Sequence, residues 1–258
     1  MQLTVKSIGR SLCLLLIMFL AACGSRNYAP VVDIYGGGSS SQRVTRGVHV
    51  VSTGETLYSI AWRYGWDFSA LARANGIRAP YTIFPGQKIR LDAKVPSRTA
   101  SRPTSTSTSK PTASKPQETT RGSTAPRPPA TVVKGTLQWQ WPGEGPLLSR
   151  FSANKVGKQG IVIAATAGAP VRAAEAGQVV YRGSGLTGYG NLLIIKHNDQ
   201  WLSAYAHNER LLVKEGDNVK AGQKIATVGS SGTSRAQLHF EIRRNGAPVD
   251  PLRYLPGR

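Results

Sequence analysis

Residues 93–134 constrain the fold most strongly, because Ser, Thr, Pro, Lys and Arg dominate them and no periodic apolar pattern runs through them. A segment of this composition cannot bury enough apolar surface to offset the chain entropy lost on folding. We therefore predict a disordered, basic, partly extended linker. Two segments of the 258-residue chain remain for folding, residues 48–92 and 135–258, and the second is long enough for a core of its own.

The N-terminus has the order of an export signal. Lys6 and Arg10 precede an apolar run over residues 12–22, which is too short to cross a bilayer as a helix. Small residues at its end directly precede Cys23, and this arrangement resembles the lipobox of bacterial lipoproteins. The resemblance implies that the signal peptide, residues 1–22, is removed and that Cys23 is lipidated. An ordinary secretory signal with a chance cysteine is the alternative.

The residues after this cysteine bear on its destination. Gly24 and Ser25 are not the aspartate that retains enteric lipoproteins in the inner membrane, so the resemblance implies an outer-membrane anchor that faces the periplasm. The glycines and serines of residues 36–41 predict that the lipidated N-terminus, residues 23–47, is a flexible tether. The chain has only two cysteines, which excludes a disulfide-rich scaffold.

The net charge of +20 first suggests a nucleic-acid partner. An exported lipoprotein does not meet chromosomal DNA, however, and the predicted linker alone carries +7 of that charge. We interpret the charge as diffuse, salt-screened affinity for anionic peptidoglycan and lipid headgroups, and we expect no nucleic-acid partner.

Residues 48–92 predict a small strand, helix, helix, strand unit. A short strand at residues 49–51 precedes a helix with an apolar stripe, whose members recur at helical spacing. Asp67 is the expected N-cap of a second helix that ends at Asn75-Gly76. A turn at Pro85-Gly86 leads into a closing strand at residues 88–91. The stripe consists of Leu57, Ile60, Ala61 and Tyr64.

The sequences at residues 49–61, 71–77 and 83–89 together resemble a LysM module. The resemblance implies binding of N-acetylglucosamine-containing glycans such as peptidoglycan. Most of the matching positions are expected to hold the fold, and a few to touch sugar. The implied glycan groove consists of Gly54, Glu55, Thr56, Leu57, Asn75, Gly76, Ile77, Ile83, Pro85, Gly86 and Gln87.

Residues 135–258 predict a mainly antiparallel β domain. Short β-branched and apolar runs alternate with glycine-containing turns, and no long helical periodicity appears. The chain is thus expected to be multidomain, a βααβ LysM module followed by this β domain. The runs lie at residues 179–181, 192–195, 202–205, 225–228 and 239–242.

The β segment resembles the LytM, or M23, peptidase family at residues 160–180, 188–191, 205–207, 219–223 and 238–241. Active members hold zinc with HxxxD and the second histidine of HxH, and use two other histidines for acid–base work. Alignment on Gly160-Ile161 puts Lys158 and Val162 at the HxxxD ligand positions, and neither can bind zinc there. The remaining positions read Gln237 in place of one catalytic histidine, His239 as the surviving ligand and His207 as the other catalytic residue. The resemblance therefore implies no catalytic residue, metal or cofactor.

The surviving histidines leave one alternative open. His197, His207 and His239 could hold a metal among themselves, although His197 is expected outside the groove and the favoured interpretation of His207 and His239 is that of hydrogen-bonded groove residues.

Lipobox, LysM module and degenerate peptidase domain together resemble the NlpD type of lipoprotein. This implies a non-catalytic murein hydrolase activator that stimulates a periplasmic N-acetylmuramoyl-L-alanine amidase during septal splitting and daughter-cell separation. A zinc endopeptidase with an unusual site and a structural wall tether are the alternatives. The candidate amidase contacts are Lys158, Val162, His207, Gln237 and His239.

Overall fold

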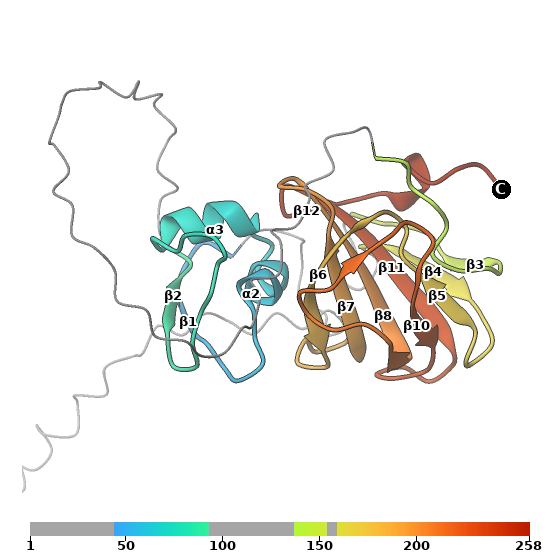
Figure 1. The fold of residues 1–258 in the computed structure, drawn as a ribbon, viewed down its shortest axis with the longest axis horizontal. Helices are drawn as coiled ribbons and strands as arrows, with labels where there is room; N and C mark the ends of the chain where they lie inside the picture. Colours follow the sequence, from blue (N-terminus) through green and yellow to red (C-terminus); the bar gives the residue numbers. More distant parts are fainter. Residues whose placement is uncertain (1–43, 93–136, 154–158) are drawn as a thin grey trace, which may run out of the picture.

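The computed structural model describes residues 44–92, 137–153 and 159–258, which form a small module and a larger β domain (Figure 1). The predictions for the signal peptide, Cys23, the linker and Lys158 concern positions outside the described residues, as does the tether prediction up to residue 43. The last tether residues belong to the module, since Val44 and Gly47 form backbone hydrogen bonds with Tyr64 and Leu91. Among the described residues, no helix has the length and apolar character needed to cross a membrane.

The module has the predicted order of strand, helix, helix, strand. Strand β1 (Val48–Val50) pairs antiparallel with β2 (Lys88–Arg90), and α2 (Leu57–Arg63) and α3 (Phe68–Ala74) lie between them in sequence. Helix α2 begins with a capping box in which the Thr56 hydroxyl accepts from the Ser59 amide and the Ser59 hydroxyl accepts from the Thr56 amide. The predicted N-cap Asp67 accepts from the Ala70 amide at the start of α3.

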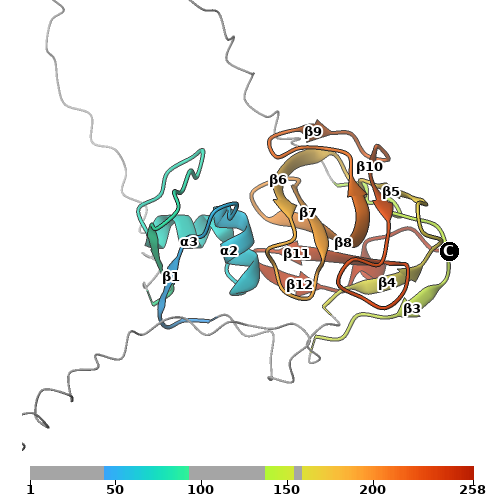
Figure 2. The ribbon, with the colours of Figure 1, turned by 90° about the horizontal axis from the view of Figure 1, so that it is seen from below.

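The β domain is mainly antiparallel, as predicted (Figure 2). Its main sheet has the order β3-β4-β11-β8-β7-β6-β9, while β10 pairs with β5 and β8, and β12 pairs with β11. The elements are β3 (Leu147–Ser149), β4 (Ile161–Ala164), β5 (Pro170–Arg172), β6 (Gly177–Gly183), β7 (Asn191–Lys196), β8 (Trp201–Leu211), β9 (Asn218–Val219), β10 (Lys224–Val228), β11 (Gln237–Arg244), β12 (Ala247–Val249) and the short 3-10 helix η2 (Pro251–Arg253).

The central strands β7 and β8 are buried on both faces, which explains their continuous apolar runs. One face contributes Leu193, Ile195 and Tyr205 to the core of the β domain, together with Phe240 of β11. Tyr205 and Phe240 pack with their ring centroids 5.3 Å apart. This core forms without any residue of the module.

The other face of these strands is covered by the module. Its buried side chains and those of the module form one continuous apolar cluster, and α2 is the module element nearest to the β domain (Figures 1 and 2). The ammonium of Lys196, at the end of β7, lies 4.9 Å from the ring centroid of Phe68 in α3. We call this surface the docking face; its residues are Ile194, Lys196, Leu202, Ala204, Glu241 and Arg243.

Candidate functional site

Three neighbouring strands, β4, β11 and β8, position the residues that the peptidase resemblance singles out. His239 on β11 lies directly opposite Val162 on β4 and opposite Ala206 on β8. His207 follows Ala206, and its ring centroid is 6.1 Å from that of His239. The structure therefore brings together Val162, His207 and His239.

Gln237 stands two residues before His239 on the same strand. Its side-chain amide donates to the Thr233 hydroxyl at 3.1 Å, and its amide oxygen accepts from Arg235 at 3.4 Å. An amide has no usable basicity at neutral pH, so this position offers hydrogen bonds and no proton transfer.

His207 is held in an uncommon backbone conformation, with a φ of +64°. Its Nδ1 lies 2.8 Å from the Ser231 carbonyl oxygen, to which it donates. Burial lowers the pKa of His207 from its ordinary value, and the neighbouring His239 acts in the same direction. His207 is therefore neutral at pH 7.

A buried polar chain occupies β11 beside His239. The Nε2 atom of His239 lies 2.9 Å from Glu241 Oε1, and Glu241 Oε2 accepts from Arg243 Nη2 at 3.1 Å. Tyr189 donates its hydroxyl to the same Oε1 at 2.8 Å. Burial alone would raise the pKa of Glu241, but the Arg243 charge and the His239 hydrogen bond outweigh it and lower this pKa to about 2. Glu241 is therefore an ionised, fully hydrogen-bonded carboxylate.

The alternative three-histidine metal site is wrong for the described residues, since none of their His, Cys, Asp and Glu side chains form a group of three that could hold a metal ion. His197 instead packs against Trp139, with ring centroids 4.9 Å apart. Its Nδ1 donates to the Ala176 carbonyl at 2.7 Å and its Nε2 lies 2.8 Å from the Ser203 hydroxyl. Burial lowers the pKa of His197 to about 4.

Trp62 of α2 covers the polar chain of Glu241 and Arg243 from the module side. Its indole donates to the Tyr189 hydroxyl at 3.0 Å. The Arg243 guanidinium carbon lies 3.6 Å from the centroid of the Trp62 ring, and Arg243 Nη1 donates to the Trp62 carbonyl at 2.8 Å. Trp62 and Tyr189 are each only 3% exposed. A cation–π contact that is shielded from water in this way is among the stronger of its kind.

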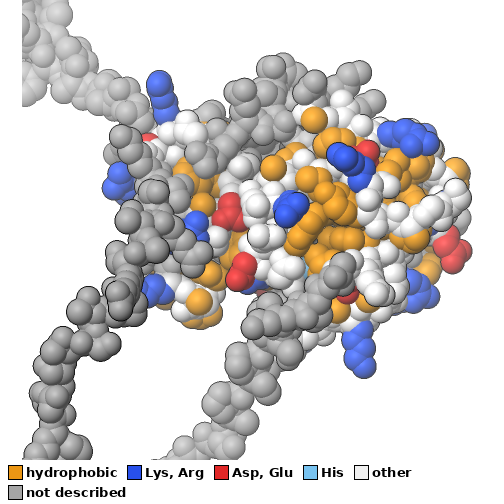
Figure 3. All heavy atoms as spheres, turned by 90° about the horizontal axis from the view of Figure 1, so that it is seen from above, with side chains coloured by type: hydrophobic (Ala, Val, Ile, Leu, Met, Phe, Trp, Pro, Cys, Tyr) orange, Lys and Arg blue, Asp and Glu red, His pale blue; other side chains and the backbone are white. Residues whose placement is uncertain are grey.

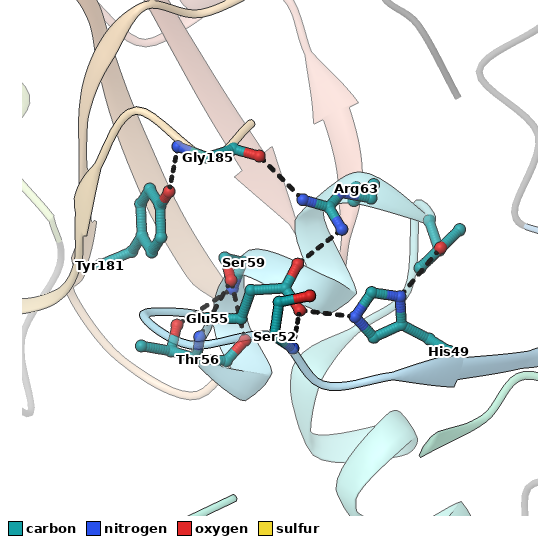
Figure 4. A network of polar contacts seen from close by, with 9 residues as sticks. His49, Ser52, Glu55, Thr56, Ser59, Arg63, Tyr181 and Gly185 are labelled. Carbon is teal, nitrogen blue, oxygen red and sulfur yellow. Dashed lines mark hydrogen bonds and ion pairs between the residues drawn. The ribbon is translucent and has the colours of Figure 1, made fainter. Parts of the chain in front are cut away.

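A second polar chain crosses the interface through Arg63 (Figure 4). Arg63 donates to the Gly185 carbonyl of the β domain at 2.9 Å and to Glu55 Oε1 at 2.6 Å. Glu55 Oε2 accepts from His49 at 2.7 Å and from the Ser52 amide at 2.8 Å. Burial would raise the pKa of Glu55, but these hydrogen bonds and the charges of His49 and Arg63 lower it to about 2.

The implied glycan groove is divided in the structure. A hollow of about 600 Å³ beside the loop after α3 contains Asn75, Gly76, Ile77 and Gln87 of the predicted set. The other predicted positions, Gly54 to Leu57, Ile83, Pro85 and Gly86, do not line it. Glu55 and Thr56 serve the polar chain and the helix cap, and Leu57 is 1% exposed in the core.

Four further residues line this hollow without having been predicted. Phe84 is 66% exposed, the most exposed of the large hydrophobic side chains among the described residues. The sequence did carry a signal for it, because Phe84 precedes a Pro-Gly turn and belongs to no apolar stripe. The others are Arg78, Pro80 and Thr82.

Comparison with protein families supports both halves of this description. Residues 49–92 match the LysM domain, and residues 156–251 match peptidase family M23.

Three relatives resemble most of the chain. "Lipoprotein NlpD/LppB homolog" of Pseudomonas aeruginosa is 46% identical over 93% of this chain and 89% of its own length. "Uncharacterized lipoprotein YgeR" of Escherichia coli is 41% identical over 99% and 95%. "Murein hydrolase activator NlpD" of Escherichia coli is 40% identical over 81% and 68%. With this identity and coverage, and with a LysM module joined to an M23 domain, the chain belongs to the NlpD/LppB family of lipoproteins.

Proposed function

We propose that the protein is a non-catalytic murein hydrolase activator. In this proposal it binds peptidoglycan through the LysM module and stimulates a periplasmic N-acetylmuramoyl-L-alanine amidase during septal wall splitting and daughter-cell separation. A relative that is 40% identical carries the name murein hydrolase activator. The proposed anchor is an acylated Cys23 in the outer membrane, with enrichment at the division septum.

The observation that carries the proposal is the pairing of Val162 with His239. The resemblance implies a zinc-binding aspartate at position 162, and a valine has no lone pair to donate to a metal. His239 itself is engaged by Glu241, whose charge is balanced by Arg243. His239 is thus hydrogen-bonded to a carboxylate that is itself paired with Arg243. We infer that this arrangement favours a binding role over zinc-dependent hydrolysis.

The same residues are candidates for the contact with the amidase. Lys158, Val162, His207, Gln237 and His239 are the proposed set, carried over from the family's active-site groove. An activator must bind the active form of its target more tightly than the inactive form, since otherwise it cannot shift the balance between them.

Glycan binding is assigned to the hollow beside the loop after α3. Its exposed Phe84 offers an apolar ring, and Asn75, Thr82 and Gln87 offer polar groups for sugar hydroxyls. A concave site with an aromatic surface and a few polar groups is typical of small-molecule and sugar recognition.

Dye release from labelled sacculi tests the function directly. The protein alone, an amidase alone and the two together are compared, and zinc content is measured in the purified protein. We expect no release by the protein alone, no stoichiometric zinc, and several-fold faster release by the pair. EDTA-sensitive release by the protein alone, with bound zinc, would establish the endopeptidase alternative. No effect in any arm would favour the structural tether.

A further inference from the structure

The docking face is closed to any partner as long as the module lies on it. Ile194 and Ala204 are 0% exposed, Glu241 is 1% exposed and Arg243 is 4% exposed. His207 and His239, next to this face, are 1% and 3% exposed. Among the proposed amidase contacts that the structure describes, His207, Gln237 and His239 are therefore buried within the chain itself, and Val162 is partly buried.

We propose that the LysM module is an intramolecular mask of the docking face, and that a partner protein must displace α2 to reach it. The inference rests on the proposed activator function, because it names what controls access to that function's site. The segment that occupies the docking face is α2 of the module. Its Trp62 and Arg63 contact Tyr189, Arg243 and Gly185 of the β domain.

The chemistry of the covered face shows why it would attract a partner once it is open. Ile194, Leu202 and Ala204 of the docking face form an apolar surface that is buried together with the module. Exposed contiguous apolar surface of this kind is typical of protein interaction sites. Arg243 beside it would lose its ring partner Trp62, and a partner's aromatic side chain could replace that ring.

Gly246 is a position at which a substitution should disrupt the contact between the module and the docking face. This residue lies in the turn between β11 and β12, and its backbone approaches the module so closely that a Cβ atom would overlap the Trp66 carbonyl carbon and the Asp67 nitrogen. Its φ is +79°. Gly168 of the same domain has a φ of +82° with open space where a Cβ would stand. The two glycines thus share the backbone strain of an alanine substitution, and only one meets the module.

The first test measures docking without any partner. A full chain in which Cys13 and Cys23 are replaced by serine receives a single thiol through Ala204→Cys, on the docking face, or through Ala226→Cys, in the core of the β domain. Both alanines are 0% exposed. Gly246→Ala is expected to speed maleimide labelling at position 204 at least tenfold and to leave position 226 slow. Gly168→Ala should leave both positions slow.

A second variant attacks the contact from the module side. Trp62→Ala removes the indole that bonds Tyr189 and the ring that covers Arg243, and Trp62 lines no part of the glycan hollow. Retention of this variant on sacculi at about 0.5 M salt, where exposed charges are largely screened, shows that its module remains folded. If neither Gly246→Ala nor Trp62→Ala speeds labelling at position 204, the docking proposal is overturned.

The final arm links docking to activation. At equal concentrations, Gly246→Ala and Trp62→Ala should stimulate the amidase several-fold more than the wild type or Gly168→Ala. Faster labelling without greater stimulation would overturn the mask. If the wild type and every variant fail to stimulate, the proposed activator function fails, and the labelling rates still decide whether the module covers the face.

Discussion

Glu241 lies at the centre of a buried cluster of charged and polar side chains in the β domain. It connects His239 to Arg243, and Tyr189 completes its hydrogen bonds. The family resemblance singled out His207 and His239 but gave no role to Glu241 or Arg243, because neither belongs to a metal-binding pattern. Strand alternation could have found them: on β11, charged or polar side chains recur at every second position between Leu238, Phe240 and Ile242.

Glu241→Gln should lower the free energy of unfolding of the β domain by about 3–5 kcal/mol, because it leaves the buried Arg243 charge without its partner. Glu209→Gln, at an exposed position on β8, is the matched control and should change stability by less than about 0.5 kcal/mol. Urea unfolding at pH 7 measures both. Equal effects of the two substitutions would contradict the assigned role of Glu241.

His197 should make the β domain sensitive to mild acid. Its pKa falls from an ordinary 6.5 to about 4 on folding, so the unfolded chain binds a proton first as the pH drops. The contribution of His197 to the free energy of unfolding is complete above pH 6.5 and is lost between pH 6.5 and 4. About 2 kcal/mol of it is lost between pH 7 and pH 5.

His197→Gln provides the comparison for this pH effect. The variant is expected to be less stable at pH 7 and to show a flatter fall in thermal midpoint between pH 7 and pH 5. Glu55 and Glu241 do not contribute there, because their stabilisation is lost only below their ordinary pKa of 4.5. Parallel pH profiles for wild type and variant would refute the assignment.

Among the elements, α2 serves both the module core and the interface. Leu57, Ile60 and Ala61 face the core of the module, as the predicted stripe requires. Trp62 and Arg63, between the stripe positions, contact the β domain instead. The helix was predictable because periodicity and the cap are local; the interface was not, because its partners lie more than 120 residues away in sequence.

Thr56→Ala should destabilise the module by about 1 kcal/mol through loss of the N-cap of α2. Thr56→Ser keeps the hydroxyl and is expected to remain near wild type. Thermal unfolding followed by far-ultraviolet circular dichroism separates the two. If alanine and serine behave alike, the capping box contributes nothing measurable.

In the β domain, the longer strands were predicted and the shortest were not. The apolar runs correspond to β6, β7, β8, β10 and β11, all of five residues or more. The two- and three-residue strands β3, β5, β9 and β12 were not predicted, since so few residues carry no alternation to recognise. The module strands β1 and β2 are equally short, and they were predicted from the turns beside them and the LysM resemblance. Strand β4 was not predicted as a strand, and its residues were noted only as part of the family resemblance.

For the whole molecule, the charge and the glycan hollow should contribute separately to wall binding. Lys and Arg side chains are scattered over the face in Figure 3 and form no single patch there. The +20 net charge therefore predicts nonspecific retention on sacculi that salt weakens.

Phe84→Ala should weaken retention about tenfold at roughly 0.5 M salt, where exposed charges are largely screened. The matched control is Leu148→Ala, which also removes a partly exposed apolar side chain, 40% exposed on β3 of the other domain. Sedimentation with purified sacculi gives the bound fraction. Equal retention of the two variants would remove the hollow from the proposed glycan site.

Residues 93–136 connect the module covalently to the β domain, so the module and a partner protein do not compete for the docking face on equal terms. The contact of Trp62 with Tyr189 is one that the partner must displace. A linker of the kind predicted from the sequence for residues 93–134 would bring its two ends together at an effective concentration on the order of 1 mM, whatever the amount of protein in the cell. A free partner at about 1 μM must then bind the docking face roughly a thousandfold more tightly than the module does, a difference of about 4 kcal/mol, to occupy half of the molecules. The length of the connecting segment thereby determines the partner concentration at which the docking face becomes occupied.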